Sequence, residues 1–89
     1  MKFCWDIHKD KTNRQKHNVS FAEASEVFGD VYSLCVDDPC HSVGEQRFLL
    51  FGVSFSGKYI VVSFMENEET IRIISAREMT RKERRAYEQ

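Results

Sequence analysis

Two histidines, one glutamate and three arginines have side chains that could transfer protons beside a bound phosphate. They are His17, His41, Glu45, Arg47, Arg72 and Arg77. Cleaving RNA without a metal needs a base for the 2′-hydroxyl, an acid for the leaving 5′-oxygen and cations beside the charged transition state. Histidine and glutamate can exchange protons, while arginine stays charged and binds phosphate through two parallel N–H groups. Singly, each residue is more often structural or simply exposed, but as a set they favour a phosphate site.

The densest run of cations lies near the C-terminus. Arg72 interrupts three isoleucines, and this β-branched pattern predicts a strand. Thr80, with Glu83 three residues later, is a capping box, which predicts that a helix begins as soon as the strand ends. Arg72 and Arg77 on the strand are predicted to bind phosphate, because guanidinium forks suit it. Arg81 by itself fits an ordinary solvated helix.

The N-terminal part predicts an edge strand followed by a helix. Lys2–Trp5 is a short apolar strand, and Asp6 is typical of the residue that caps a helix, here one running to about His17. After Ile7 this helix has no large apolar residue, so it faces either water or a ligand. Asn18 is suited to the left-handed conformation that ends a helix.

A second, shorter helix supplies core residues. Residues 20–23 form another capping box, which opens an amphipathic helix over 21–28. The predicted core positions are Phe21, Ala24, Val27 and Phe28. Gly-Asp at 29–30 ends the helix, and alternation over 31–36 predicts a strand.

The rest of the chain predicts three consecutive antiparallel strands. Apolar runs at 46–55, 58–65 and 70–77 are joined by a Ser-Gly hairpin and a Glu-rich turn at 66–69. The predicted fold is α+β: a small antiparallel β-sheet, made of this meander plus edge strands, with two N-terminal helices and one C-terminal helix. The first two helices cover one face, and the C-terminal helix or a partner covers the other. The length supports a single domain over 1–89.

Cysteines and apolar segments limit the class of protein. Cys35, Cys40 and His41 resemble metal ligands, but no fourth ligand stands at a recognisable spacing, so we predict neither a metal nor another cofactor. Three cysteines at irregular spacing fit a reducing compartment. No stretch has the pattern of an export signal or a membrane span, so we expect a cytoplasmic protein without a membrane partner.

Charge is segregated along the chain, although the net charge is only −1. Residues 1–17 carry five basic against two acidic side chains, and residues 72–89 carry six against three. Residues 18–71 carry two basic against nine acidic side chains. If the two basic ends meet in space, they form a face suited to a polyanion. The acidic remainder keeps the protein dissolved or meets a basic partner.

Spaced residue patterns follow one another in order over nearly the whole chain. The first are Phe3-x-Trp5-Asp6, Asn13-x-x-Lys16-His17-x-Val19-Ser20-Phe21-x-Glu23-Ala24 and Val27-Phe28-x-Asp30. The later ones are Asp38-x-x-His41-Ser42-x-x-Glu45-x-Arg47, Gly52-x-Ser54, Arg72-Ile-Ile-Ser-Ala-Arg77 and Glu83-Arg84-x-x-Tyr87. Together they resemble the BrnT toxins of type II toxin–antitoxin modules. The ordered set is more specific than any one motif.

The resemblance implies a RelE-like fold and a bacterial, metal-independent ribonuclease that arrests translation. Its partners would be RNA and a BrnA-like antitoxin. The antitoxin would neutralise the toxin, and the toxin would contact operator DNA only through the antitoxin. Carried over by position, the catalytic candidates are His17, Glu45, Arg47, Arg72 and Arg77. The RNA-binding candidates are Lys9, Lys16, His41 and Arg81. The resemblance leaves open whether His17 or Glu45 is the general base.

The chain departs from the family pattern at two places. Asn18 stands where the family usually has glycine, and asparagine tolerates the same positive φ. Three glutamates in the 66–69 turn stand where a basic residue is common, which argues against RNA contact there. The alternative to catalysis is a binding module, in which the same cations hold nucleic acid or an acidic antitoxin without cleaving RNA.

Overall fold

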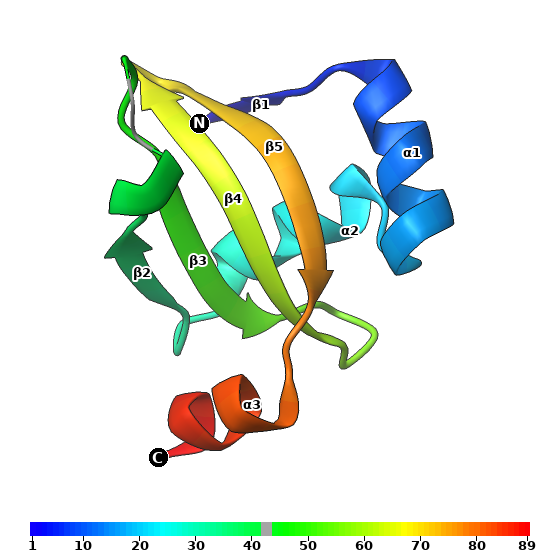
Figure 1. Cartoon of the computed structure of the whole chain (residues 1–89), viewed down its shortest axis with the longest axis vertical. Coiled ribbons are helices and arrows are strands. Elements are labelled where there is room, and N and C mark those ends of the chain that lie inside the picture. Colours follow the sequence, from blue (N-terminus) through cyan, green and yellow to red (C-terminus); the bar gives the residue numbers. More distant parts are fainter. Residues whose placement is uncertain (42–43) are drawn as a thin grey trace.

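The computed structural model describes residues 1–41 and 44–89, which form a sheet with helices beside it (Figure 1). The strands are β1 (Lys2–Cys4), β2 (Leu34–Asp37), β3 (Phe48–Val53), β4 (Tyr59–Asn67) and β5 (Thr70–Glu78). The helices are α1 (Ile7–His17), α2 (Phe21–Glu26) and α3 (Arg81–Glu88), with 3-10 helices η1 (Val27–Gly29) and η2 (Pro39–His41). The predicted α+β class is confirmed. In this part of the chain, none of the helices has both the length and the apolar character needed to cross a membrane.

The sheet is mixed, with the strand order β1-β5-β4-β3-β2. β2, β3, β4 and β5 pair antiparallel, which confirms the predicted meander. β1 runs parallel to β5, with Phe3 opposite Ile71. The prediction of a wholly antiparallel sheet is therefore wrong at this edge. The direction follows from the connectivity: α1 lies beside the second half of β5, so β1 must run along β5 to bring the chain there (Figure 1).

One face of the sheet is closed by α2 and η1, which pack against β3, β4 and β5. The contact buries apolar side chains from both layers: Phe21, Ala24, Val27, Leu50, Ile60, Val62, Phe64, Ile71 and Ile73. α1 does not share in this cover, although we predicted that both helices would. Because it lacks an apolar stripe, it flanks the β5 edge instead (Figure 1), and its buried residue is the polar Asn13.

The predicted helix ends are confirmed, with one difference in the second helix. Asp6 caps α1 by accepting two backbone N–H groups, and Asn18 ends it in the left-handed conformation at φ 57°. Ser20 caps α2 by accepting the N–H of Glu23. The Glu23 carboxylate, however, accepts hydroxyls of the β3–β4 hairpin rather than closing the predicted box. α2 is also shorter than predicted, and its last turn is the 3-10 helix η1.

The strand predicted after α2 starts late, at Leu34, because Asp30 forms a turn. The Asp30 carboxylate accepts the N–H of Tyr32 at 3.0 Å and that of Val53 at 2.9 Å. The Tyr87 hydroxyl donates to the same carboxylate at 2.5 Å. This one side chain therefore ties the turn before β2 to β3 and to α3.

β5 contains a bulge near its middle. Ser63 of β4 lies opposite Ser75, but the next residue, Phe64, lies opposite Ile73. Ile74 is therefore an extra residue on β5 without a partner of its own on β4. A bulge of this kind shifts the alternation of side chains between the two faces of a strand.

Candidate active site

The bulge brings the two arginines of β5 to the same face of the sheet. In an unbroken strand, Arg77 would share a face with the buried Ile71 and Ile73, because side chains alternate. The extra residue reverses this order, so Ala76 enters the core at 1% exposure. Arg77 therefore joins Arg72 on the face that α2 leaves open, which we call the open face.

At the far end of β5, His17 and Arg77 line one hollow of about 80 Å³. The other lining residues come from β3, β4 and β5, and they are Leu49, Val61, Ser63, Ser75 and Ala76. Ser63 on β4 and Ser75 on β5 lie directly opposite one another, and each brings a hydroxyl group to the hollow. An imidazole, a guanidinium and two hydroxyls can hold a phosphate group and take a proton from a hydroxyl beside it.

A second hollow of about 340 Å³ adjoins the first, since His17 and Ser75 line both. Its cations come from α1, where Lys9 and Lys16 lie on the same side of the helix with Thr12 between them. The predicted RNA-binding residues Lys9 and Lys16 therefore lie beside the His17 hollow. Their charge makes this part of the surface attractive to a polyanion.

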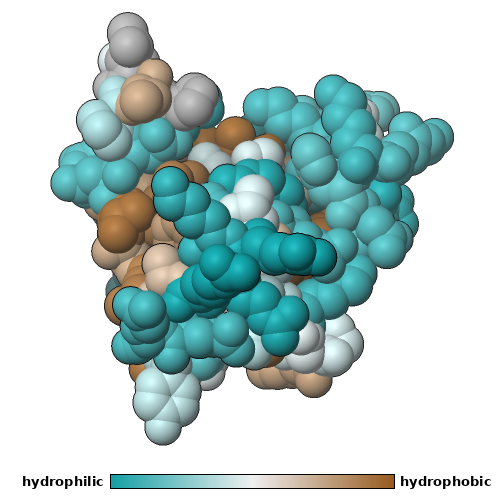
Figure 2. Space-filling view, turned by 60° about the horizontal axis from the view of Figure 1, so that its bottom comes forward, coloured by the Kyte–Doolittle hydropathy of each residue, from teal (hydrophilic) through white to brown (hydrophobic). Residues whose placement is uncertain are grey.

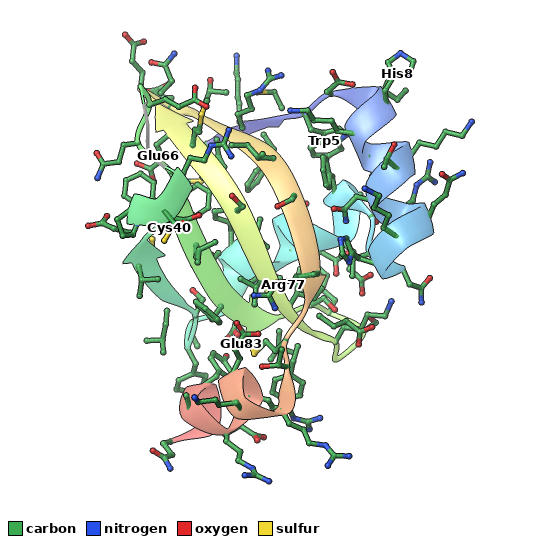
Figure 3. The ribbon with its side chains drawn as sticks, in the orientation of Figure 1. Trp5, His8, Cys40, Glu66, Arg77 and Glu83 are labelled. Carbon is green, nitrogen blue, oxygen red and sulfur yellow. The ribbon has the colours of Figure 1, made fainter. Side chains whose placement is uncertain are left out.

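Arg77 is held in place by a carboxylate of α3. Its Nη1 and Nη2 groups donate to the two oxygens of Glu83 at 2.7 and 2.9 Å, and Nη1 also donates to the Glu78 carbonyl at 3.2 Å. Figure 3 shows the Arg77–Glu83 pair where β5 leads into α3. The hydrogen bonds to Glu83 raise the pKa of Arg77, and those from Arg77 lower the pKa of Glu83 to about 2.

Polar contacts attach the rest of α3. The Tyr87 hydroxyl reaches Asp30, and the Arg84 guanidinium lies 3.9 Å from the centroid of the Tyr59 ring. No residue of α3 is fully buried. Figure 2 shows an apolar area beside the charged side chains of this helix, on the β2 side, where Leu34 and Val36 are exposed. The Arg77–Glu83 pair is therefore one of several contacts that attach α3 to the sheet.

We expect Glu83→Gln to lower the stability of the protein at pH 7 by about 1 kcal/mol, because it removes the charged partner of Arg77. The folded-state pKa of Glu83 is lowered from 4.5 to about 2. Its contribution is therefore complete above pH 4.5 and is lost as the pH falls toward 2. Urea unfolding at several pH values measures this. If the variant and the wild type differ equally at pH 7 and pH 2.5, the ion pair is not the cause.

Arg72 lies on the open face but away from the His17 hollow. It is opposite Met65 on β4, whereas Arg77 is opposite Val61. Four residues of a strand separate those partners, so the two arginines are about 13 Å apart along the sheet. One phosphate cannot reach both, but an extended polynucleotide can. The six side chains predicted to act together therefore do not form one cluster.

Glu45 and Arg47 lie at the Arg72 end of the open face. The Arg47 guanidinium and the Glu45 carboxylate form an ion pair at 3.1 Å. Glu45 also lines a hollow with Met65, the residue that lies opposite Arg72. Predicted catalytic groups thus stand at two places on one face: His17 with Arg77, and Glu45 and Arg47 near Arg72.

Comparison with known proteins identifies the family. Residues 5–83 match the sequence model of the family described as "Ribonuclease toxin, BrnT, of type II toxin-antitoxin system". The chain belongs to the BrnT family. A crystal structure of the Brucella abortus ribonuclease toxin BrnT is similar, with a TM-score of 0.72 at 24% sequence identity. The similarity covers 91% of this chain and 99% of the Brucella one, and it confirms the fold. No curated protein matches the chain.

One of the predicted RNA-binding residues lines neither hollow: Arg81 is exposed at the start of α3. The side chain of another, His41, lies outside the described part of the structure. Cys35 and Cys40, which resemble metal ligands in the sequence, are both exposed. Across residues 1–40 and 44–89, no three His, Cys, Asp or Glu side chains converge as metal ligands would.

The sequence patterns did not indicate every residue of this candidate site. Ser75 lies within the recognised Arg72–Arg77 motif, so the motif itself held the signal. Ser63 had no signal, because only strand pairing brings it opposite Ser75. Glu83 was predicted to form a capping box with Thr80, and this is confirmed. The same carboxylate also accepts hydrogen bonds from Arg77. Asn13 was quoted in a motif and given no role.

Proposed function

We propose that this BrnT-family protein is a metal-independent endoribonuclease, with its reaction centre in the hollow between α1 and the end of β5. The observation that carries the proposal is that His17 and Arg77, distant in sequence, line the same hollow of about 80 Å³. A proton acceptor beside a fixed cation is what attack by a 2′-hydroxyl on phosphorus requires. The family description, a ribonuclease toxin, supports the same reaction class.

In the proposed reaction, His17 takes the proton of the 2′-hydroxyl next to the scissile phosphate. The 2′-oxygen then bonds to phosphorus, the bond from phosphorus to the 5′-oxygen breaks, and that oxygen takes a proton from water. The products end in a 2′,3′-cyclic phosphate and a 5′-hydroxyl. Arg77, with the hydroxyls of Ser63 and Ser75, holds the phosphate oxygens on which negative charge grows.

The pairing of Arg77 with Glu83 is compatible with this role. A guanidinium has five N–H donors. The bonds to Glu83 and to the Glu78 carbonyl use three of them. Glu83 therefore orients Arg77 while further N–H groups can meet a phosphate. The carboxylate also keeps the guanidinium from turning away, which reduces the entropy lost when RNA binds.

The RNA strand is proposed to cross the open face on either side of the reaction centre. Lys9 and Lys16 of α1 bind phosphates on one side. Arg72, about 13 Å along the sheet, binds a phosphate on the other side together with Arg47. Glu45 is then the residue that orients Arg47, and His17 is the general base. Arg81 adds positive charge at the α3 end.

Family membership supports a proposal about the antitoxin and the cellular role. We propose that a BrnA-like antitoxin neutralises the protein, that operator DNA is reached only through it, and that RNA cleavage arrests translation in the cytoplasm. An antitoxin segment lying over the open face would exclude RNA from His17. Acidic side chains on that segment would meet Arg72 and Arg77.

Incubation of the purified protein with naked RNA in excess EDTA tests the proposal. We expect cleavage that leaves 2′,3′-cyclic phosphate ends, because the scheme needs only side chains and water. Cleavage that returns only when Mg²⁺ is restored would contradict metal-independent chemistry. No cleavage of naked RNA, and none with translating ribosomes, would favour the binding module.

A further inference from the structure

Asn13 is the buried residue of α1, a helix whose other side chains are mostly exposed. It is 6% exposed, and its amide makes three hydrogen bonds. Nδ2 donates to the carbonyls of Val19 and Ala76, each at 2.8 Å. Oδ1 accepts the N–H of Ala76 at 3.1 Å. A buried amide with all these bonds fixes two elements relative to each other, because breaking them would leave buried polar groups unpaired.

The two bonds to Ala76 replace a missing neighbour of β5. β1 pairs with β5 only as far as Arg72, so within residues 1–41 and 44–89 no strand lies at this edge along the second half of β5. The amide of Asn13 accepts the N–H and donates to the C=O of one residue, as a neighbouring strand would. α1 is thereby attached to the edge of the sheet through a polar side chain, although it has no apolar stripe to pack there.

The attached residue lies directly after the bulge. Ala76 stands between Ser75 and Arg77, the two residues of β5 that bring polar groups to the His17 hollow. If β5 paired with β4 without the extra residue Ile74, the alternation would reverse. Arg77 would then point toward the core and Ala76 toward the open face. By holding both backbone groups of Ala76, Asn13 favours the bulged register.

The same side chain also fixes the end of α1. His17 follows Asn13 by four residues, so the two lie on one side of the helix, one turn apart. The bond to the Val19 carbonyl holds the chain just beyond the helix end. The distance between the His17 imidazole and the residues flanking Ala76 therefore depends on Asn13.

We propose that Asn13 is a positioning residue of the reaction centre: its amide fixes Ala76 in the bulged register and thereby brings His17 and Arg77 into one hollow. The inference rests on the proposed ribonuclease function and adds a residue to it. Asn13 also borders the larger hollow beside Lys9 and Lys16. Its amide, however, is bonded to Val19 and Ala76, so its proposed role is to position His17 and Arg77. A small displacement between a base and a cation is costly in rate, since catalysis needs both at their working distances.

The experiment compares Asn13→Asp and Asn13→Ala with the wild type in steady-state RNA cleavage. Aspartate keeps the size and one acceptor but loses the donor to both carbonyls, and alanine loses all three bonds. We expect kcat to fall ten- to a hundredfold in both variants, with KM within threefold, since the RNA-binding lysines and arginines remain. Val27→Ala is the matched control: it opens the core under α2 and lowers stability without touching Asn13 or the hollow.

Three outcomes would overturn the inference. The first is that the Asn13 variants lose stability but keep kcat, as Val27→Ala should, which would make Asn13 a purely structural residue. The second is that the wild-type protein does not cleave RNA. This result would contradict the proposed function as well, and it would be known before any variant is made. The third concerns hydrogen exchange in the wild type, which is informative even if the variants do not fold. The Ala76 amide should exchange as slowly as amides paired between β4 and β5, and fast exchange would contradict the bond to Asn13.

Discussion

Replacing His17 with alanine is expected to reduce kcat for RNA cleavage about a thousandfold, as is typical when a general base is removed. The residue lies in the last turn of α1 and is exposed, so the fold should tolerate the change. Binding should change little, because the cations around the hollow remain. Single-turnover cleavage at saturating enzyme measures the chemical step, and thermal unfolding checks that the protein is intact.

Two further variants test whether a loss of rate in His17→Ala is specific to that residue. Gln15→Ala changes an exposed residue of the same helix that lines neither hollow, and it should cleave at the wild-type rate. Glu45→Ala tests the second candidate for the base. If Glu45→Ala loses a thousandfold while His17→Ala does not, the reaction centre is at the Arg72 end of the open face and our assignment is wrong.

The parts of this fold that sequence predicts best are those fixed by neighbouring residues. Asp6 and Asn18 end α1 as predicted, and Thr80 with Glu83 forms the predicted capping box. Each of these depends on side chains reaching backbone groups only a few residues away. Strand order in the meander is predicted for the same reason, because short hairpins leave few alternatives.

The parts that sequence predicts poorly depend on pairing between distant segments. The direction of β1 is decided by where α1 must lie, and no local pattern records it. The bulge at Ile74 is decided by the register between β4 and β5. Counting alternate residues in the run from Arg72 to Arg77 would put those arginines on opposite faces. The candidate site was therefore recognised as a set of residues, but its division into two places was not.

The segregation of charge has a structural counterpart. The bonds from Asn13 to Ala76 bring the end of α1 beside the end of β5, so His17 and Arg77, one from each basic part of the sequence, line the same hollow. Arg77 is also paired with the carboxylate of Glu83. Net charge along the sequence could not reveal that pairing.

Replacing Arg77 with alanine is expected to lower kcat about a thousandfold, because it removes the cation that stabilises the charged phosphate in the transition state. Arg72→Ala should act differently. It lies about 13 Å along the sheet, where it would hold a flanking phosphate, so KM should rise about tenfold while kcat stays within a few-fold. Separate kcat and KM values for the two variants measure the difference. The reverse pattern would move the reaction centre to Arg72.

Arg77→Ala also releases Glu83, so the loss of rate has to be separated from a displacement of α3. Glu83→Gln breaks the same ion pair but keeps the guanidinium, and kcat should stay within a few-fold of wild type. Arg77→Lys keeps the positive charge but lacks the two parallel N–H groups of a guanidinium, so its kcat should lie between those of Arg77→Ala and the wild type. Arg85→Ala, an exposed arginine of α3, serves as the matched control and should be fully active. If Glu83→Gln loses as much rate as Arg77→Ala, the arginine acts by holding α3 in place rather than by binding phosphate.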